Sequence, residues 1–188
     1  MSIVDIKQGI LRPSDLLADA AQEINAADER WADHQKQDEN FKSRLLRYAF
    51  NLFPPFRTSG AWLTQISADV RYVRLKIPLK LKTRNYVGTL CGGNMYSAVD
   101  GVYMVMLIKN LGNDYLVWDK AATIRYKKPA KGTLFAEFRL TEGELQEIKY
   151  EVARQGKIDR EYLIQLVDES DTVCAEVTKT IHIKQKVA

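Results

Sequence analysis

Two adjacent glycines and a carboxylate form the pattern in this sequence that most strongly suggests chemistry. Gly92 and Gly93 come just before a long apolar segment, and Asp100 follows Gly92 by eight residues. Glycine lets a ligand approach the backbone closely. If a helix begins at these glycines, its first N–H groups lack intrahelical partners and form the positive end of the helix dipole. Such donors would suit an oxygen that becomes negative during a reaction.

Asp100 is the candidate catalytic group, because its sequence neighbours are nearly all apolar. An ionised carboxylate in such surroundings is costly unless it is paired, so its presence calls for a reason. Asn94 and Ser97 precede it at three-residue intervals, which would place the three side chains near one helix face. The plainer alternatives are a simple turn at the glycines and a structural ion pair at Asp100.

The spacing of these residues bears on quaternary structure. On a single helix, eight residues separate Gly92 from Asp100 by roughly 12 Å, so the two cannot contact the same carbonyl within one subunit. If both act on one substrate, the site must be shared across a homodimer in which two such helices run in opposite senses. A dimer of dimers would also satisfy this requirement.

The elements that must position these residues follow from the hydrophobic pattern. Gly93 to Leu111 is apolar almost all round, which indicates one buried helix that ends at Gly112 and Asn113. Period-two alternation or apolar clustering predicts strands on both sides of it, and apolar spacing predicts one further helix. The predicted strands cover residues 63–69, 73–81, 115–127, 133–140, 162–167 and 173–184, and the further helix covers residues 142–155. The sum is an α+β fold in which an antiparallel sheet wraps one central helix.

The first part of the chain has a different character. Residues 1–50 show helical apolar spacing among many charges, and the prolines that follow, Pro54 and Pro55, end helical structure. We therefore expect an N-terminal helical extension over residues 1–50 and one domain over residues 51–188.

Composition narrows the class of protein. The 188 residues carry a formal net charge of +4, which permits an anionic ligand without demanding a nucleic acid. Two cysteines are too few for a disulfide scaffold. The longest apolar stretch is too short to cross a bilayer. We expect a cytoplasmic protein with neither a nucleic acid nor a membrane as its partner. Neither the histidines nor the cysteines have metal-ligand spacing, and we expect no metal or other cofactor.

Around the glycine pair, the sequence resembles the hot-dog-fold acyl-CoA thioesterases of the phenylacetate-pathway type. Asn85, Gly88, Gly92, Gly93 and Asp100 match the spacing of that family's motif, and the segment Ile124-x-Tyr-x-x-Pro-Ala-Lys resembles its next strand and turn. The resemblance covers roughly residues 50–184. It implies a curved sheet around one long helix and a dimer formed edge to edge or through the helices.

The resemblance also implies roles. Asp100 would act as general base or nucleophile on an acyl-CoA or acyl-carrier thioester, the Gly92 N–H would polarise the carbonyl, and Asn85 would hold substrate or water. Gly93, Asn94, Ser97 and, by a loose alignment, Asp119 would contact the substrate. The family's usual histidine before the glycine pair is replaced by Cys91, and the compact family members lack the N-terminal extension.

Two other functions stay open. A non-catalytic protein that binds an acyl thioester or fatty-acyl ligand would use the same scaffold, because fold does not fix function. A hydratase or dehydratase would need a histidine near the central helix. The chain has only His34 and His182, and neither stands beside the glycine motif, which makes this the weaker alternative.

Overall fold

The computed structural model describes residues 39–186, and the sheet in it follows the alternation of the sequence. In β2 (Tyr72–Ile77), Val73, Leu75 and Ile77 are all buried. The strand ends at Ile77 because Pro78 has no backbone N–H to donate to a neighbouring strand. The predicted continuation of this strand to residue 81 is therefore wrong, and Leu81 is 83% exposed.

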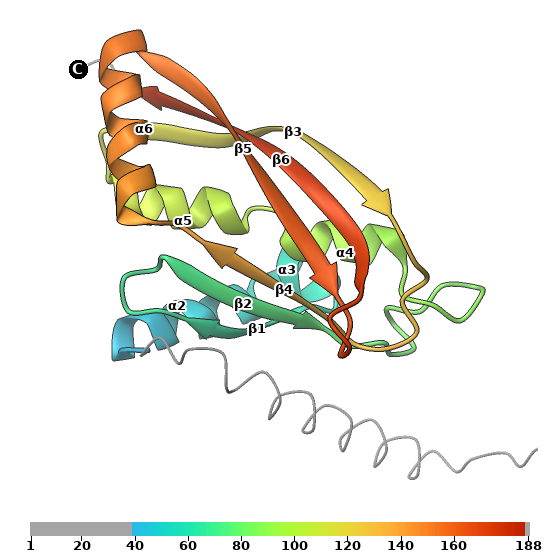
Figure 1. Cartoon of the computed structure of the whole chain (residues 1–188). Coiled ribbons are helices and arrows are strands. Elements are labelled where there is room, and N and C mark those ends of the chain that lie inside the picture. The colour runs from blue at the N-terminus through green and yellow to red at the C-terminus, as the bar shows by residue number, and fades with distance from the viewer. Residues whose placement is uncertain (1–38, 187–188) are drawn as a thin grey trace, which may run out of the picture. The chain divides into compact units, whose positions relative to one another are not determined.

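The sheet has six strands in the order β1-β2-β4-β5-β6-β3, and every neighbouring pair is antiparallel. The other strands are β1 (Trp62–Ile66), β3 (Tyr115–Tyr126), β4 (Leu134–Arg139), β5 (Lys157–Val167) and β6 (Val173–Gln185). Figure 1 shows that the long strands β5, β6 and β3 run side by side. The order leaves β1 and β3 as the two edges of the sheet.

The sheet opens between β4 and β5, the third and fourth strands in its spatial order. β4 and β5 are paired only through Phe135 and Val167, and beyond that point they diverge (Figure 1). α6 (Glu142–Gln155) links their separated ends and buries Leu145, Ile148 and Val152. Its bounds are those predicted from the sequence, with Thr141 as N-cap and Gly156 in the left-handed conformation after its last turn.

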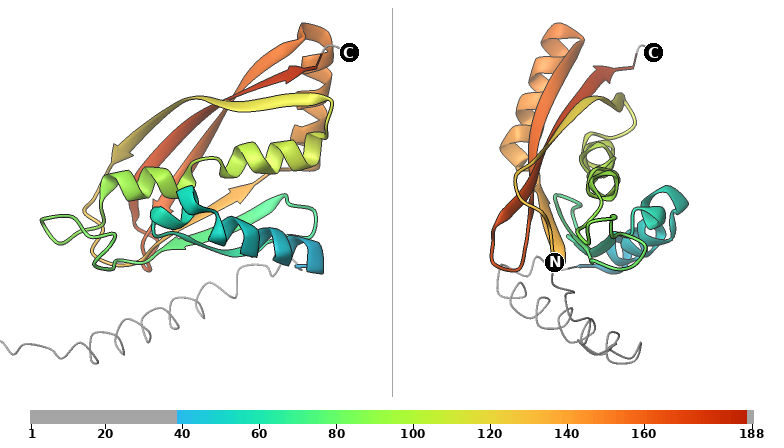
Figure 2. Two further views of the ribbon diagram at one scale, coloured as in Figure 1. Left: turned by 180° about the vertical axis from the view of Figure 1, so that it is seen from behind. Right: turned by 90° about the vertical axis from the view of Figure 1, so that its right-hand side faces the viewer.

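The predicted central helix is present, but it is broken. α4 (Gly92–Val99) and α5 (Val102–Leu111) are separated by Asp100 and Gly101, so an uninterrupted helix to Leu111 is a wrong prediction. Gly101 has φ 73°, a left-handed conformation that glycine adopts without steric cost and that ends the run of helical backbone. Both helices run along the curved sheet (Figure 2).

Two helices precede the first strand. α2 (Phe41–Leu52) begins with a capping box between Asn40 and Ser43, and α3 (Pro54–Thr58) begins at a proline, where no intrahelical N–H is needed. The buried Asn51 side chain donates to the Leu63 carbonyl at 3.0 Å and accepts from its N–H at 2.8 Å, which fixes α2 against β1.

The predicted domain boundary between residues 50 and 51 thus falls inside α2. The division into an extension and a domain stays a proposal, and predictions for residues 1–38 lie outside the described residues.

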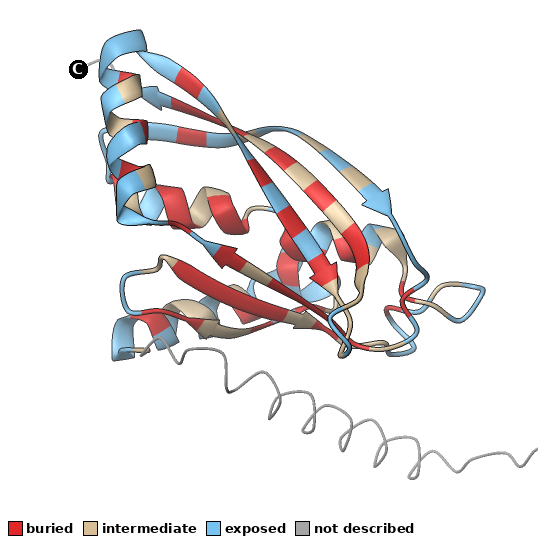
Figure 3. Cartoon of the chain, in the orientation of Figure 1, coloured by how far each residue is buried: buried red, intermediate tan, exposed pale blue. Residues whose placement is uncertain are grey.

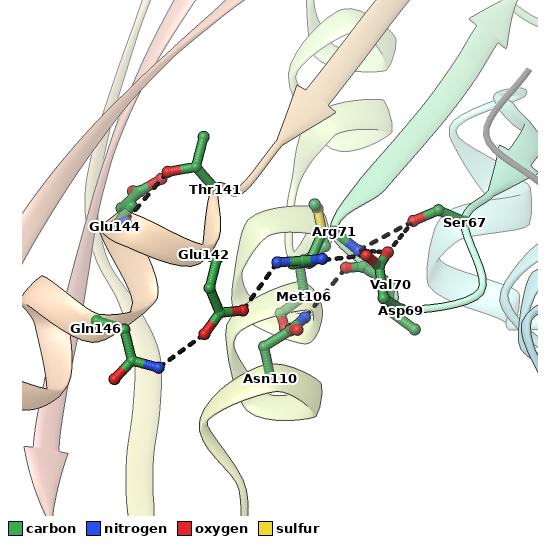
Figure 4. Close-up of polar contacts among 10 residues, drawn as sticks. All are labelled: Ser67, Asp69, Val70, Arg71, Met106, Asn110, Thr141, Glu142, Glu144 and Gln146. Carbon is green, nitrogen blue, oxygen red and sulfur yellow. Dashed lines mark hydrogen bonds and ion pairs between the residues drawn. The ribbon is translucent and has the colours of Figure 1, made fainter. Parts of the chain in front are cut away.

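Polar contacts tie the turn between β1 and β2 to the two helices nearest to it (Figure 4). Arg71 pairs with Asp69 at 2.6 Å and with Glu142, in the first turn of α6, at 2.9 Å. The Asn110 side chain of α5 donates to the carbonyl of Val70, whose φ is 57°. These contacts hold the turn in place away from the glycine motif.

The core lies between the sheet and the helices α4 and α5 (Figure 3). Side chains from all of these elements are less than 2% exposed, among them Ala98, Leu107, Leu75, Phe138 and Ile181. Across the described residues, no helix is long and apolar enough to cross a membrane.

Candidate functional site

Asp100 lies at the break between α4 and α5. It is the C-cap residue of α4, with extended backbone angles (φ −67°, ψ 135°), and its side chain is 51% exposed. The apolar stretch around it therefore does not bury it, and the expectation of a carboxylate buried in a helix is wrong. The turn through Gly101 carries the carboxylate out of the helical run, where a ligand can reach it.

The buried charge at this position is a lysine that sequence reasoning missed. Lys179 lies on β6 with only 2% of its side chain exposed, and its Nζ is 2.5 Å from Asp100 Oδ1 and 3.1 Å from Asp119 Oδ2. It also lies 5.5 Å from the centroid of the Tyr96 ring. A buried ammonium is costly unless it is paired, and here two carboxylates pair with it.

The two carboxylates set the charge state of this lysine. Burial disfavours the ammonium, but the hydrogen bond from Lys179 to Asp100 and the negative charges of Asp119 and Asp100 together outweigh it, so the pKa of Lys179 is raised above its ordinary value. Lys179 is therefore charged at neutral pH and is no nucleophile. Its role is to hold Asp100.

Asp119 comes to the same place from β3. It pairs across the strands with Ile181, two residues from Lys179, immediately before an irregularity in the register between Asp119 and Ala121. Its Oδ1 is buried and accepts no hydrogen bond within the described part of the chain. The structure thus brings Asp100 and Asp119 together through Lys179, although the alignment that suggested Asp119 was loose.

A cavity of about 420 Å³ opens beside these carboxylates. Asp100, Asp119 and Ser97 line it together with apolar side chains. The apolar residues are Phe50, Phe53, Pro55 and Phe56 from the α2–α3 region and Met104 and Val105 from α5. We call this cavity the carboxylate pocket.

A second cavity, of about 660 Å³, lies at the other end of α4. Its lining includes Asn85, Gly92 and Tyr126, together with Lys127, Lys128 and Lys131, and contains no carboxylate. Lys127 pairs with Glu176 of β6 at 2.9 Å. We call this cavity the lysine pocket. Gly92 and Asp100 thus line separate cavities of one subunit.

Gly92 has a steric reason to be glycine as well as its place at the helix start. A Cβ at this position would lie 2.5 Å from the Oη of Tyr126 and 2.7 Å from its Cζ. The Tyr126 side chain, at the end of β3, therefore lies directly against the first turn of α4. By contrast, a Cβ on Gly93 would meet nothing within 4 Å.

The predicted amide residues are engaged within the protein. Asn85 Nδ2 donates to Thr89 Oγ1 at 2.8 Å, and its Oδ1 accepts from the N–H groups of Val87 and Thr89, so its side chain builds the turn before α4. Asn94 donates to the Ser59 carbonyl at 2.8 Å and lines neither pocket. Of the α4 side chains, only Ser97 joins Asp100 at the carboxylate pocket.

The other residues weighed from the sequence lie elsewhere. His182 lines neither pocket; its Nδ1 pairs with Asp159 of β5, and its ring contacts Trp118 of β3. The half-buried Cys91 directly precedes α4, and its N–H donates to the Thr83 carbonyl. No group of three metal-binding side chains occurs among residues 39–186.

A sequence model described as a domain of unknown function, DUF4442, matches residues 42–183. The chain belongs to the DUF4442 family. No curated protein matches the chain.

Solved structures show the same fold as the DUF4442 chain. A protein of unknown function from Pseudomonas aeruginosa, described as a probable thioesterase, is 23% identical with a TM-score of 0.67, over 76% of this chain and 95% of that one. A Haemophilus influenzae thioesterase is 12% identical with a TM-score of 0.58, over 82% and 98%. Thioesterase superfamily member 2 of Mus musculus is 17% identical with a TM-score of 0.56, over 77% and 98%.

These likenesses confirm the predicted hot-dog fold. At such identities they concern the fold alone. What the two pockets of the DUF4442 chain do must be argued from its own residues.

Proposed function

We propose that this DUF4442 protein hydrolyses an acyl thioester at a site shared by two subunits, with Asp100 from one and the Gly92 N–H from the other. The observation that carries the proposal is the state of Asp100. Its carboxylate is fixed from behind by a buried ammonium, is half exposed in front, and opens onto a cavity that could hold a substrate. A fixed and accessible carboxylate is what a general base requires.

The separation of Gly92 from Asp100 supports the shared site. They lie at opposite ends of α4, in different pockets, so one carbonyl cannot reach both in one subunit. A two-fold homodimer in which the two α4 helices lie side by side and antiparallel would bring the start of one α4 to the end of the other.

The sheet edge supports the same assembly. β3 is a twelve-residue edge strand, and at its two ends Leu116 is 43% exposed, Trp118 40% and Tyr126 56%. A long edge with exposed apolar side chains favours pairing with another strand. Since β3 carries both Asp119 and Tyr126, a dimer along this edge would place its interface beside both pockets.

The proposed reaction needs only these groups and water. Asp100 accepts a proton as a water molecule attacks the thioester carbon, and the negative charge on the carbonyl oxygen is held by the N–H of Gly92. The C–S bond then breaks, the carboxylic acid is released, and the sulfur takes the proton back from Asp100 to leave as a thiol.

The lysine pocket supports coenzyme A as the thiol part of the substrate. Its three lysines surround a cavity without a carboxylate, next to the helix start that carries Gly92. Phosphate groups are attracted by such a positive surface. An acyl carrier would present one phosphate, whereas coenzyme A presents three. Lys127 is already paired with Glu176, so the other two lysines, Lys128 and Lys131, carry the preference for the coenzyme. The cytoplasmic location of the protein remains a prediction.

A specific observation favours the second function, a protein that binds an acyl thioester without hydrolysing it. Asp100 already has Lys179 as an ion-pair partner, so a structural role alone would explain a charged residue at this point of the fold. The experiment must therefore separate turnover from binding.

The experiment compares two matched substitutions. In Asp100→Asn, the release of free thiol from acyl-CoA esters should fall by a factor of about 10² or more while the dimer persists, because the general base is lost. Asp159→Asn is the control: this carboxylate is also half exposed and paired with a lysine, Lys120, but lines neither pocket. Wild-type turnover in Asp100→Asn would contradict the proposal, and tight ligand binding without turnover by the native protein would favour the binder.

A further inference from the structure

The carboxylate pocket has one wall made of aromatic rings. Phe50 and Phe56 meet edge to face, with ring centroids 4.9 Å apart, and Phe56 is only 4% exposed, so this part of the wall is packed into the core. Phe53, between α2 and α3, is 55% exposed and stands at the rim. The wall therefore combines a fixed apolar surface with one exposed ring.

Part of the lining comes from α5. Met104 and Val105 follow the break at Gly101 and line the pocket while remaining partly accessible. Methionine is unbranched and adapts to the shape of what it contacts. Apolar side chains from the α2–α3 region and from α5 thus line a cavity of about 420 Å³, within the size range of small-molecule sites.

The pocket's charges bear on which ligands it accepts. Asp100 and Asp119 are both in its lining, while Lys179, which lies behind them, neutralises one of the two negative charges. An anionic group that entered this space would lose its hydration and meet a net negative charge. The pocket therefore favours a neutral, apolar group and disfavours a second carboxylate.

We propose that the carboxylate pocket binds the acyl group of the substrate, and that this acyl group is neutral and apolar rather than one that ends in a second carboxylate. The inference rests on the proposed function of Asp100, which would sit where the acyl chain meets the carbonyl. The contrast between the pockets also sets the direction of the substrate: the phosphates lie toward the lysines, and the acyl chain lies toward the phenylalanines.

Binding without turnover tests this assignment directly. The probes are coenzyme A analogues in which a methylene replaces the thioester sulfur, with straight acyl chains of increasing length. Calorimetry with the native protein should show Kd falling by about fourfold for each added methylene until the cavity is full. An analogue of equal length that ends in a carboxylate should bind at least about tenfold more weakly. A Kd that is independent of both chain length and terminal charge would overturn the proposal.

A pair of neighbouring substitutions locates the effect. Phe53→Ala removes the ring at the rim and should weaken the octanoyl analogue by about tenfold, with no change for the acetyl analogue, which is too short to reach it. Leu52→Ala is the matched control: Leu52 is 65% exposed, precedes Phe53 in the chain, and does not line the pocket. Equal losses in the two variants, or equal losses for the two analogues, would contradict the assignment.

The two proposals fail in different ways. If the analogues bind with the expected preference but no acyl-CoA ester is hydrolysed, the acyl pocket stands and the hydrolase proposal fails. If esters are hydrolysed at rates independent of chain length and unaffected by Phe53→Ala, the hydrolase proposal stands and the acyl pocket fails.

Discussion

The two pockets at the ends of α4 use lysine in opposite ways. Behind the carboxylate pocket, Lys179 is 2% exposed and serves the protein, because it is paired with the two aspartates that it holds. In the lysine pocket, Lys127, Lys128 and Lys131 are exposed; Lys127 pairs with Glu176, and Lys128 and Lys131 are placed where they can serve a ligand. A lysine's function here depends on its burial and its partners, and neither is visible in the residue type.

The largest expected effect is the loss of stability when the buried lysine is replaced. Lys179→Met would leave Asp100 and Asp119 close together without their shared cation. Removing one partner of a fully buried ion pair costs about 3–5 kcal/mol, but water screens the half-exposed Asp100, so we expect a loss of about 2 kcal/mol in the free energy of unfolding. Urea denaturation of the variant measures it.

Lys128→Met provides the control for that loss. Its side chain is exposed, and such surface substitutions usually change stability by no more than about 0.5 kcal/mol. Equal destabilisation by the two substitutions would contradict the distinction drawn between the two pockets.

Substitutions in the lysine pocket should change the affinity for coenzyme A. Lys128→Met and Lys131→Met should each weaken coenzyme A by about threefold to fivefold at low salt, because each removes an exposed charge near a phosphate. The difference from the native protein should shrink as salt is added. Titrations at two salt concentrations measure it, and a loss that is independent of salt would show that the lysines act through packing.

The smallest effect concerns pH. Burial lowers the pKa of Lys179, but the hydrogen bond to Asp100 and the charges of Asp119 and Asp100 together outweigh it, so the pKa is raised in the folded protein. A raised pKa contributes stability that is fully present below the unfolded value of 10.5 and is lost as pH rises through the folded value. The native protein should therefore lose more stability above pH 10.5 than Lys179→Met does, as thermal melts across that range can show.

Much of the fold could be predicted because local signals and tertiary packing agree. The helix over Glu142–Gln155 has its apolar residues at helical spacing and a glycine after its end, and the structure gives it the predicted bounds. The strand from Tyr115 ends one residue earlier than predicted. In the helix, the spacing that predicts the element is also the spacing of its buried side chains, Leu145, Ile148 and Val152.

The central helix was misjudged because a long apolar run conceals a break in the backbone. The Asp100-Gly101 pair was the available signal, since an aspartate followed by glycine is typical of a turn. Reading that pair as a turn would have predicted both the interruption of the helix and the exposure of Asp100.

The ion pair between Asp100 and Lys179 could not be predicted from the sequence. Lys179 falls at an inward position of β6, in step with Val177 and Ile181, so strand alternation predicts that it is buried. Its partners are 79 and 60 residues earlier in the chain, and no local pattern identifies them. The two pockets are likewise made by segments that meet only in the folded protein.

The measurement that tests the shared site most directly is complementation between two inactive variants. Asp100→Asn and Gly92→Pro subunits, the second of which lacks the proposed N–H donor, are mixed by co-expression, and thiol release is compared with that of each variant alone. In a two-fold dimer with a shared site, each mixed dimer has one site free of both changes, so random mixing should restore about a quarter of native activity. If the site lies within a single subunit, every subunit carries one defect, and the mixture will be as inactive as its components.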